Sequence, residues 1–313
     1  MNPKAGAVCV MAAVLVLAGA AQGTTITLPH NMSVGGVNWY GLSSAGNGML
    51  CWNDASSGPS GGGGDHWDEA MGVRVGGYGY PGSGTFDKTG NTITGPVQSL
   101  DGLDVTVQYR AVGGLPVMRQ LVCLTNPSTT IRTTTVSWHS NTGNDSGQRI
   151  IGTSTGDLSA GLDDRWIVTA DSSNLAQAGT ETNAWVLYGG ASPAVPTSAV
   201  SMVDGIGGFG GWGQQGLSAR FDMALNPGQT RYLMWFAAVT PTGQAGLNRA
   251  AAITPGSSTW STLTDDLTSE QLNATANWTA SSQNAVVPEP LTLIGVLGGI
   301  AGLGGYIRKR RAA

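Results

Sequence analysis

The sequence contains little charge. Asp, Glu, Lys and Arg make up 11% of its 313 residues, whereas globular domains usually carry about 25%. The formal net charge is −4, although four of the 15 basic residues are grouped at positions 308–311. The rest of the chain is therefore mildly acidic and lacks the positive field that nucleic-acid binding requires. We expect no nucleic-acid partner.

Cysteine is also scarce, at three residues. Cys9 lies in an N-terminal apolar run that we expect to be removed, which leaves Cys51 and Cys123. In an oxidising compartment these two could form one disulfide. The alternative is two buried thiols that pack as small apolar side chains. The distance between them in the fold decides, and the sequence spacing does not give it.

Glycine, in contrast, is abundant. There are 49 glycines, about twice the usual share, and Ser, Thr and Asn are frequent. Glycine and asparagine adopt positive φ angles at low cost, so this composition predicts short strands joined by tight turns. It is typical of exported β-proteins.

The N-terminus agrees with export. Lys4 precedes the apolar run AVCVMAAVLVLAGA, and small residues follow as far as Gly23. This order is that of a signal peptide at residues 1–23, carried by the secretion translocon and cut by signal peptidase after Ala21 or Gly23. A retained N-terminal membrane helix is the alternative.

Alternating strands dominate residues 24–280, which we expect to form the ectodomain. In DVTVQYRAV one face carries Val105, Val107, Tyr109 and Ala111, and the other carries Thr106, Gln108 and Arg110. This is the period of a half-buried antiparallel strand. Two further strands, 118–126 and 130–140, follow across short turns and predict a meander. Later strands are expected at 164–170, 183–190, 197–203, 217–225 and 231–240.

These strands predict a mainly β protein, a large antiparallel β-sandwich, with two smaller sandwiches as the alternative. The segment 231–240 is apolar on both faces, which suits a central covered strand. Short helices are expected near the C-terminal end at 244–253, which is Ala-rich, and after Thr268. Gln271 follows Thr268 by three residues and completes a capping box.

One acidic cluster could carry chemistry. Asp65, His66, Asp68 and Glu69 lie within five residues, beside Trp67. Carboxylates and an imidazole could bind a metal, and a carboxylate pair could hydrolyse glycosides. However, adjacent residues of an extended segment point to opposite faces. We therefore favour a polar loop that enters the next strand.

A second acidic set could bind Ca²⁺ through oxygen ligands. Its members are Asp145, Asp157, Asp163 and Asp164. No EF-hand spacing accompanies them, so we favour turn-forming aspartates and expect no other cofactor. His139 and Ser140 lack the G-x-S-x-G elbow of a nucleophilic serine, and no catalytic triad is predicted.

The chain has ten tryptophans. We expect Trp138 and Trp235 in the core. Trp52, Trp67 and Trp212 lie near glycine-rich loops and could stack on sugar rings, because aromatic faces suit the apolar faces of pyranoses. Exopolysaccharide is therefore a candidate partner.

The C-terminal tail follows a linker at residues 281–287. Leu291–Ile307 contains 17 residues without charge, which as a helix spans roughly 25 Å, the short end for a bilayer. The next residues are Arg308, Lys309, Arg310 and Arg311. Basic residues stay cytoplasmic, so this transmembrane helix would leave the ectodomain outside.

The motif before that helix is specific. Pro288, Glu289 and Pro290, then the apolar span, then the basic cluster, resemble the PEP-CTERM sorting signal of Gram-negative bacteria over residues 288–313. The resemblance implies recognition of the three-residue motif by an exosortase, a membrane cysteine protease-transpeptidase, and delivery to the cell surface or extracellular matrix. An ordinary membrane anchor is the alternative.

The central region, TNPSTTIRTTTVSWHSNTGNDSGQRIIGTSTGD, resembles uncharacterised exported bacterial β-domains. Together these observations predict an exported surface or matrix protein that is structural or polysaccharide-associated. They favour a non-enzymatic role. The alternative is a carbohydrate-active enzyme, a β-sandwich hydrolase or lyase.

Overall fold

The computed structural model describes the central part of the chain. The described residues are 23–28, 30–34, 37–39, 43–45, 49–51, 66–67, 69–81, 84–142, 148–177, 182–190, 193, 195–203 and 216–279. The predicted signal peptide up to residue 22, the linker at 281–287 and the sorting tail at 288–313 lie outside these ranges. They stay predictions.

The described part forms mainly antiparallel β-structure, as predicted. Its strands are β1 Thr24–Thr27, β2 Met32–Val34, β3 Val37–Trp39, β4 Ser43–Ala45, β5 Met49–Cys51, β6 Glu69–Val75, β7 Tyr78–Gly79, β8 Thr85–Thr89, β9 Thr92–Thr94, β10 Gln98–Leu100, β11 Leu103–Ala111, β12 Val117–Thr125, β13 Arg132–Asn141, β14 Arg149–Thr153, β15 Trp166–Ala170, β16 Thr182–Val186, β17 Ala199–Val203, β18 Gly216–Leu225 and β19 Thr230–Thr240. The helices are α1 Gly243–Ala252, α2 Ser258–Leu263 and α3 Ser269–Ala274.

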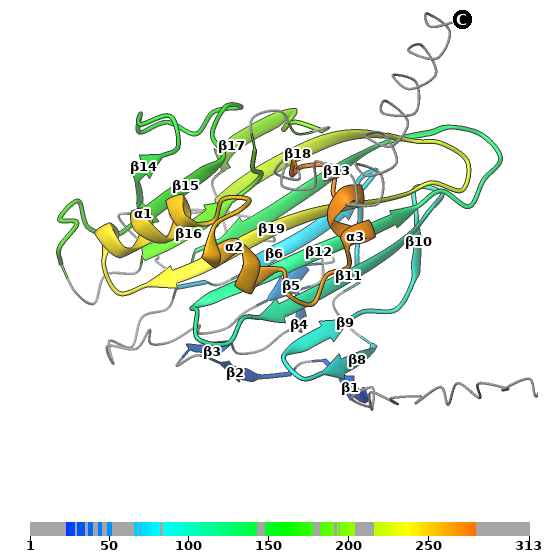
Figure 1. Ribbon diagram of the computed structural model, residues 1–313, viewed down its shortest axis with the longest axis horizontal. Coiled ribbons are helices and arrows are strands. Elements are labelled where there is room, and N and C mark those ends of the chain that lie inside the picture. Colours follow the sequence, from blue (N-terminus) through cyan, green and yellow to red (C-terminus); the bar gives the residue numbers. More distant parts are fainter. Residues whose placement is uncertain are drawn as a thin grey trace, which may run out of the picture.

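The strands form two large sheets and one small hairpin (Figure 1). The ten-stranded sheet has the order β1-β8-β9-β11-β12-β19-β16-β15-β14, with β10 paired to β11. The seven-stranded sheet has the order β17-β18-β13-β6-β5-β4, with β7 paired to β6. Strands β2 and β3 pair with each other.

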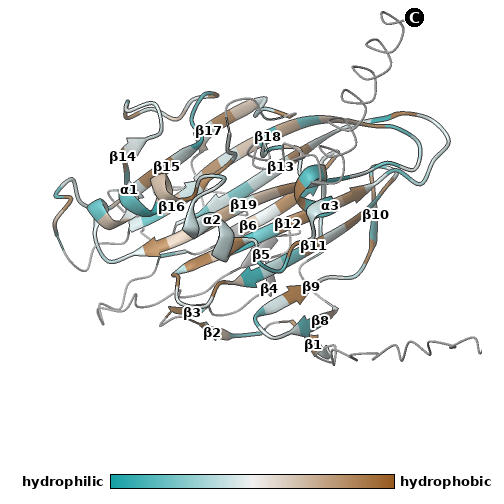
Figure 2. Cartoon of the chain, in the orientation of Figure 1, coloured by the Kyte–Doolittle hydropathy of each residue, from teal (hydrophilic) through white to brown (hydrophobic). Residues whose placement is uncertain are grey.

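The two large sheets pack face to face around one apolar core, so the described part is a β-sandwich. Trp138 of β13 and Trp235 of β19 come from different sheets, are fully buried, and stack with ring centroids 5.8 Å apart. Their predicted place in the core is confirmed. Figure 2 shows hydrophobic residues along the central strands of the sandwich.

The alternation of residues 103–111 holds in β11, where every odd-numbered residue is buried and every even-numbered one is half-buried. The central strand is also as predicted. β19 lies between β12 and β16, and its side chains enter both the inter-sheet core and the apolar cluster on the outer face.

The predicted meander is wrong at its third strand. β11 and β12 pair, but β13 belongs to the other sheet, between β6 and β18. The place beside β12 is taken by β19, whose two apolar faces require cover on both sides. In the turn after β12, buried Asn126 donates hydrogen bonds to Thr130 O (2.8 Å) and to Leu225 O of β18 (3.0 Å), which tie the turn to the other sheet.

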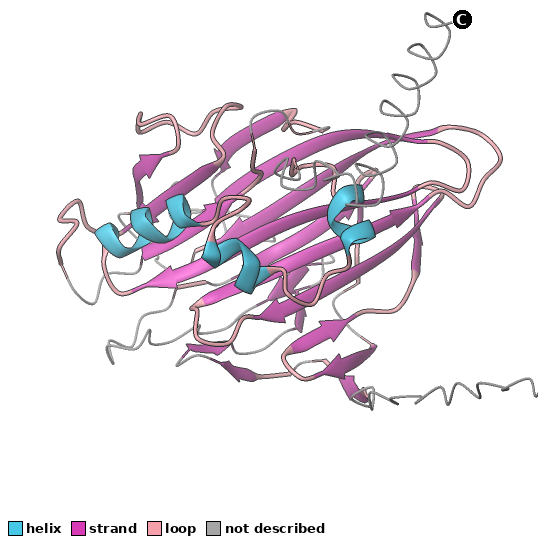
Figure 3. Cartoon of the chain, in the orientation of Figure 1, coloured by secondary structure: helices cyan, strands magenta, loops and turns pink. Residues whose placement is uncertain are grey.

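Three short helices lie over the outer face of the ten-stranded sheet (Figure 3). Thr242 caps α1, and both hydrogen bonds of the predicted capping box between Thr268 and Gln271 are present at α3. Helix α2, capped by Ser257, was not predicted. In the part of the chain that the structure describes, none of the helices has the length and hydrophobicity needed to span a bilayer.

Candidate functional site

The predicted acidic cluster is only partly described. His66 is buried, its Nδ1 lies 3.3 Å from Asn183 Oδ1, and its backbone carbonyl accepts a hydrogen bond from Asn183 Nδ2 (2.9 Å). Burial lowers the pKa of His66, although Asn183 opposes this. Asp65, Asp68 and the side chain of Glu69 lie outside the described residues, so the role of the cluster stays a prediction. Among the described residues, no three His, Cys, Asp or Glu side chains are grouped to hold a metal.

The idea that Trp67 stacks on a sugar is wrong. Trp67 is fully buried and packs against Trp185, with ring centroids 5.5 Å apart. Its position after a glycine-rich segment suggested exposure, but the side chain enters the inter-sheet core. Trp52 and Trp212 lie outside the described residues.

The aspartates of the 157–164 loop form turns, as we favoured. Buried Asp164 accepts hydrogen bonds on both carboxylate oxygens, from a hydroxyl and from a backbone amide of the same loop (2.8 Å each). Asp157 accepts from the backbone amide two residues on (3.1 Å). Asp163 lies in the same loop, and Asp145 is outside the described residues.

The remaining candidates lie apart. His139 and Ser140 are successive residues of β13, so they face opposite sides of the sheet. Cys123 is a free cysteine on β12 of the ten-stranded sheet, whereas Cys51 lies on β5 of the other sheet with its side chain outside the described residues. Their disulfide stays a prediction.

A site that the sequence did not reveal lies on the outer face of the ten-stranded sheet. Strand register places Asp87, Thr94 and Gln108 in one row across β8, β9 and β11. The neighbouring row contains Thr89, Thr92, Arg110 and Arg119. Because residues two apart share a face, both rows project on the same side.

All residues of these rows except the buried Arg119 line a hollow of about 440 Å³. Its lining consists of Asp87, Thr89, Asn91, Thr92, Thr94, Gln108, Arg110 and Asp266. The first five belong to the β8–β9 hairpin, and Asp266 comes from the connection between α2 and α3. Every lining side chain is a hydroxyl, amide, carboxylate or guanidinium group.

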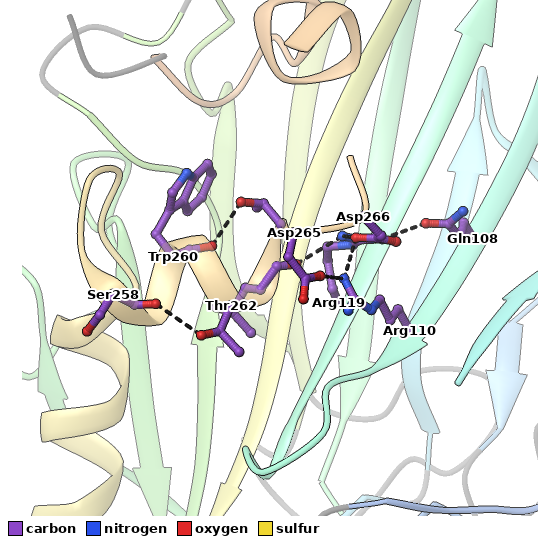
Figure 4. A network of polar contacts seen from close by, with 10 residues as sticks. Gln108, Arg110, Arg119, Ser258, Trp260, Thr262, Asp265 and Asp266 are labelled. Atoms are coloured by element: carbon purple, nitrogen blue, oxygen red, sulfur yellow. Dashed lines mark hydrogen bonds and ion pairs between the residues drawn. The ribbon is translucent and has the colours of Figure 1, made fainter. Parts of the chain in front are cut away.

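A buried charge network closes one side of the hollow (Figure 4). The side chain of Arg119 is 0% exposed and binds Asp266 in a bidentate manner, at 2.5 Å from Nη1 to Oδ1 and 2.8 Å from Nη2 to Oδ2. Its Nη1 also donates to Leu263 O (2.9 Å). Arg110 pairs with Asp266 and, at 2.5 Å, with Asp265. Several kcal/mol are needed to bury each ion, so the guanidinium depends on these partners.

The network fixes the protonation of Asp266. Burial alone would raise the pKa of this carboxyl, but hydrogen bonds and positive charges from Arg119 and Arg110 outweigh it and hold the pKa below its usual value. Asp266 is therefore ionised at neutral pH. It cannot readily supply the proton that a glycosidase acid gives to its leaving group.

The network also orients Gln108. The Oε1 atom of Gln108 accepts a hydrogen bond from Arg119 Nη2 (2.6 Å). The amide plane then directs Nε2 away from Asp266, as Figure 4 shows. Gln108 lines the hollow together with acceptors such as Asp87, and Arg119 leaves its Nε2 donor unengaged. A ligand rich in hydroxyl groups, which both donate and accept, fits this arrangement.

Sequence reasoning missed this site for a definable reason. The polar face of β11 was visible in the alternation, including Gln108 and Arg110. An arginine amid the apolar residues of MRQLVCLTN was the further signal, because a buried arginine needs an acidic partner. That partner, Asp266, lies 147 positions away.

No protein-family model and no curated protein matches the chain. Among solved structures, it is similar to a candidate aldose 1-epimerase from Klebsiella pneumoniae (9% identity, TM-score 0.39, covering 73% of this chain and 91% of that one). It is also similar to a galactose mutarotase related enzyme from Lactobacillus acidophilus (9%, 0.37, 69% and 98%). A third is an α-galactosidase from Geobacillus stearothermophilus (11%, 0.34, 73% and 42%). At these TM-scores the likeness carries no weight for fold or function.

Proposed function

We propose that the protein is an exported surface or matrix component that binds a neutral polysaccharide in the hollow beside Asp266. The observation that carries the proposal is the fixed Gln108 amide, oriented by buried Arg119 at the edge of a hollow lined by polar groups. Carboxylate acceptors and amide donors that are held in place can recognise sugar hydroxyls without moving. Binding then costs little side-chain entropy.

The proposed destination of the protein agrees with this ligand. The Pro288-Glu289-Pro290 tail resembles a signal for delivery to the cell surface or an exopolysaccharide matrix. A protein delivered there meets polysaccharide at high concentration. Even weak individual sites then hold it in place.

Binding is tested by calorimetric titration of the full-length chain with soluble neutral polysaccharides: dextran, mannan, galactan and xylan. We expect at least one to bind, and Gln108→Ala to weaken it about tenfold, the loss of one well-made hydrogen bond. The matched control is Gln244→Ala, an exposed glutamine on α1 away from the hollow. If no neutral polysaccharide binds, or Gln108→Ala binds as well as the wild type, the proposal fails.

The same mixtures separate binding from catalysis. A hydrolase would release new reducing ends, and a lyase would release unsaturated products that absorb in the ultraviolet. Unchanged polysaccharide after long incubation supports a binding role. Cleavage that Gln108→Ala slows would replace it with the carbohydrate-active enzyme.

The proposed sorting is tested separately by measuring the intact mass of the protein from two hosts, one with the exosortase and one without it. We expect the C-terminal segment to be removed only where the exosortase is present. A chain that ends at Ala313 in both hosts contradicts sorting and leaves the ligand proposal in place.

A further inference from the structure

Two arginines lie in one row on the outer face of the seven-stranded sheet. Register pairs Ser137 of β13 with Arg74 of β6 on one side and with Arg220 of β18 on the other. Directly paired residues share a face, so the three side chains project together. Strands are spaced about 4.8 Å apart, which places the two arginine backbones about 10 Å apart with Ser137 between them. Both side chains can reach a group that sits over Ser137.

These arginines differ from those beside Asp266. Within the described residues, the ion pairs involve Arg110 and Arg119, and neither Arg74 nor Arg220 has a carboxylate at salt-bridge distance. Arg74 Nε is buried and has no hydrogen-bond partner there; the same holds for Arg119 Nε, but the terminal nitrogens of Arg119 bind Asp266. A buried donor without an acceptor destabilises the protein until one is supplied. A planar guanidinium is best satisfied by a carboxylate or a sulfate, which can bind it in a bidentate manner.

The electrostatic field in this row is positive. His139 is two residues from Ser137 on the same strand face. Burial, followed by the charges of Arg74 and Arg220, lowers its pKa to about 4. The imidazole is therefore neutral near pH 7. Its lowered pKa reflects burial and the charges of the two nearby guanidinium groups.

The row continues into a hollow of about 760 Å³. Ser137 and Arg220 line it together with Thr133, Thr135, Asp101 and Asp222. Both carboxylates accept hydrogen bonds from threonine hydroxyls, Asp101 from Thr134 and Asp222 from Thr135 (2.7 Å each). One end of this surface thus offers guanidinium groups, and the other offers hydroxyl and carboxylate groups.

We propose that this surface, the arginine row with its adjoining hollow, binds an acidic glycan. The acidic group, a uronate carboxylate or a sulfate ester, lies over Ser137 between Arg74 and Arg220, and neighbouring sugar hydroxyls bind in the hollow. Only the choice of a glycan as carrier rests on the proposed function, because recognition of the anion follows from the arginines alone. With the hollow beside Asp266 on the opposite outer face, the protein would bind two polymer chains at once.

The test titrates the full-length chain with oligogalacturonate, with a sulfated oligosaccharide, with sodium sulfate and with neutral dextran oligosaccharide. We expect one or both acidic glycans to bind, more weakly as salt is added. The double variant Arg74→Gln, Arg220→Gln should lose at least tenfold in affinity. The control Arg149→Gln, an exposed arginine of β14 in the other sheet, should bind as the wild type does.

A second measurement avoids variants. An anion over Ser137 offsets the two guanidinium charges, so the bound acidic glycan should raise the pKa of His139, followed by NMR. Binding that the double variant retains, or no binding of either acidic glycan, overturns the proposal. Sulfate binding as tight as the glycans' overturns its glycan part. Gln108→Ala should leave acidic-glycan binding unchanged, so failure of the neutral-polysaccharide proposal is seen separately.

Discussion

The two outer faces of the sandwich carry the same kinds of residue in opposite states. Beside α2 and α3, Arg119 is fully buried, and its two terminal nitrogens bind Asp266, Gln108 and Leu263 O. On the seven-stranded sheet, Arg220 and Asp222 are exposed, and Asp222 is bound only by a threonine hydroxyl among the described residues. The helices make the difference. Where the described helices cover the ten-stranded sheet, charged side chains are paired and stabilise the structure. On the outer face of the seven-stranded sheet, which none of the described helices covers, charged side chains remain available to a ligand.

The largest expected difference between the two faces is seen when one aspartate is removed from each. Asp266→Ala leaves Arg119 buried without its main partner, and we expect the free energy of unfolding to fall by about 3–5 kcal/mol. Asp222→Ala removes one exposed hydrogen bond and should lower it by less than about 1 kcal/mol. Urea unfolding of the full-length chain measures both. Equal losses would mean that the network beside Asp266 contributes no more than an ordinary surface contact.

The sequence patterns predicted strands and helices of both faces, but they did not predict how these elements assemble. The alternation of β11, the doubly apolar β19 and the capping box of α3 are local, so the sequence alone predicted them. β13 lies in the second sheet because β19, about 100 residues later in the chain, pairs with the free edge of β12. A pairing between segments so far apart cannot be read from a local pattern. The pairing of Arg119 with Asp266 and the row from Arg74 to Arg220 both follow from this strand order. Trp67 was misjudged because a neighbouring glycine-rich segment says nothing about burial.

A second prediction concerns the open face. Gly76 has φ +58°, and a Cβ there would lie 2.2 Å from the carboxyl carbon of Asp101. Gly76→Ala must therefore displace Asp101 from Thr134, in addition to the left-handed strain, and we expect a loss of about 2–4 kcal/mol. Gly77, at φ +87° with nothing within 4 Å of such a Cβ, is the matched control.

Gly77→Ala should cost only the backbone strain, about 1–2 kcal/mol. Thermal unfolding of both variants isolates the clash. If the two are equally destabilised, the carboxylate of Asp101 is not held against the hairpin, and the open face is less preorganised than its geometry indicates. The acidic-glycan affinity of Gly76→Ala should then also equal that of Gly77→Ala.

The smallest effect is the dependence on pH of the paired face. The pKa of Asp266 is lowered in the folded protein, so the folded state binds this proton more weakly than the unfolded chain, where an aspartate has a pKa of about 3.9. The ionised pair therefore stabilises the fold fully above that value and loses its contribution as pH falls below about 4 through the lowered pKa. The difference in unfolding free energy between wild type and Asp266→Asn should be constant from about pH 5 to 8 and shrink at about pH 3. A difference that stays constant down to pH 3 would show that Asp266 stabilises the helix connection through its hydrogen bonds and not through its charge, which would bring the two faces closer in kind.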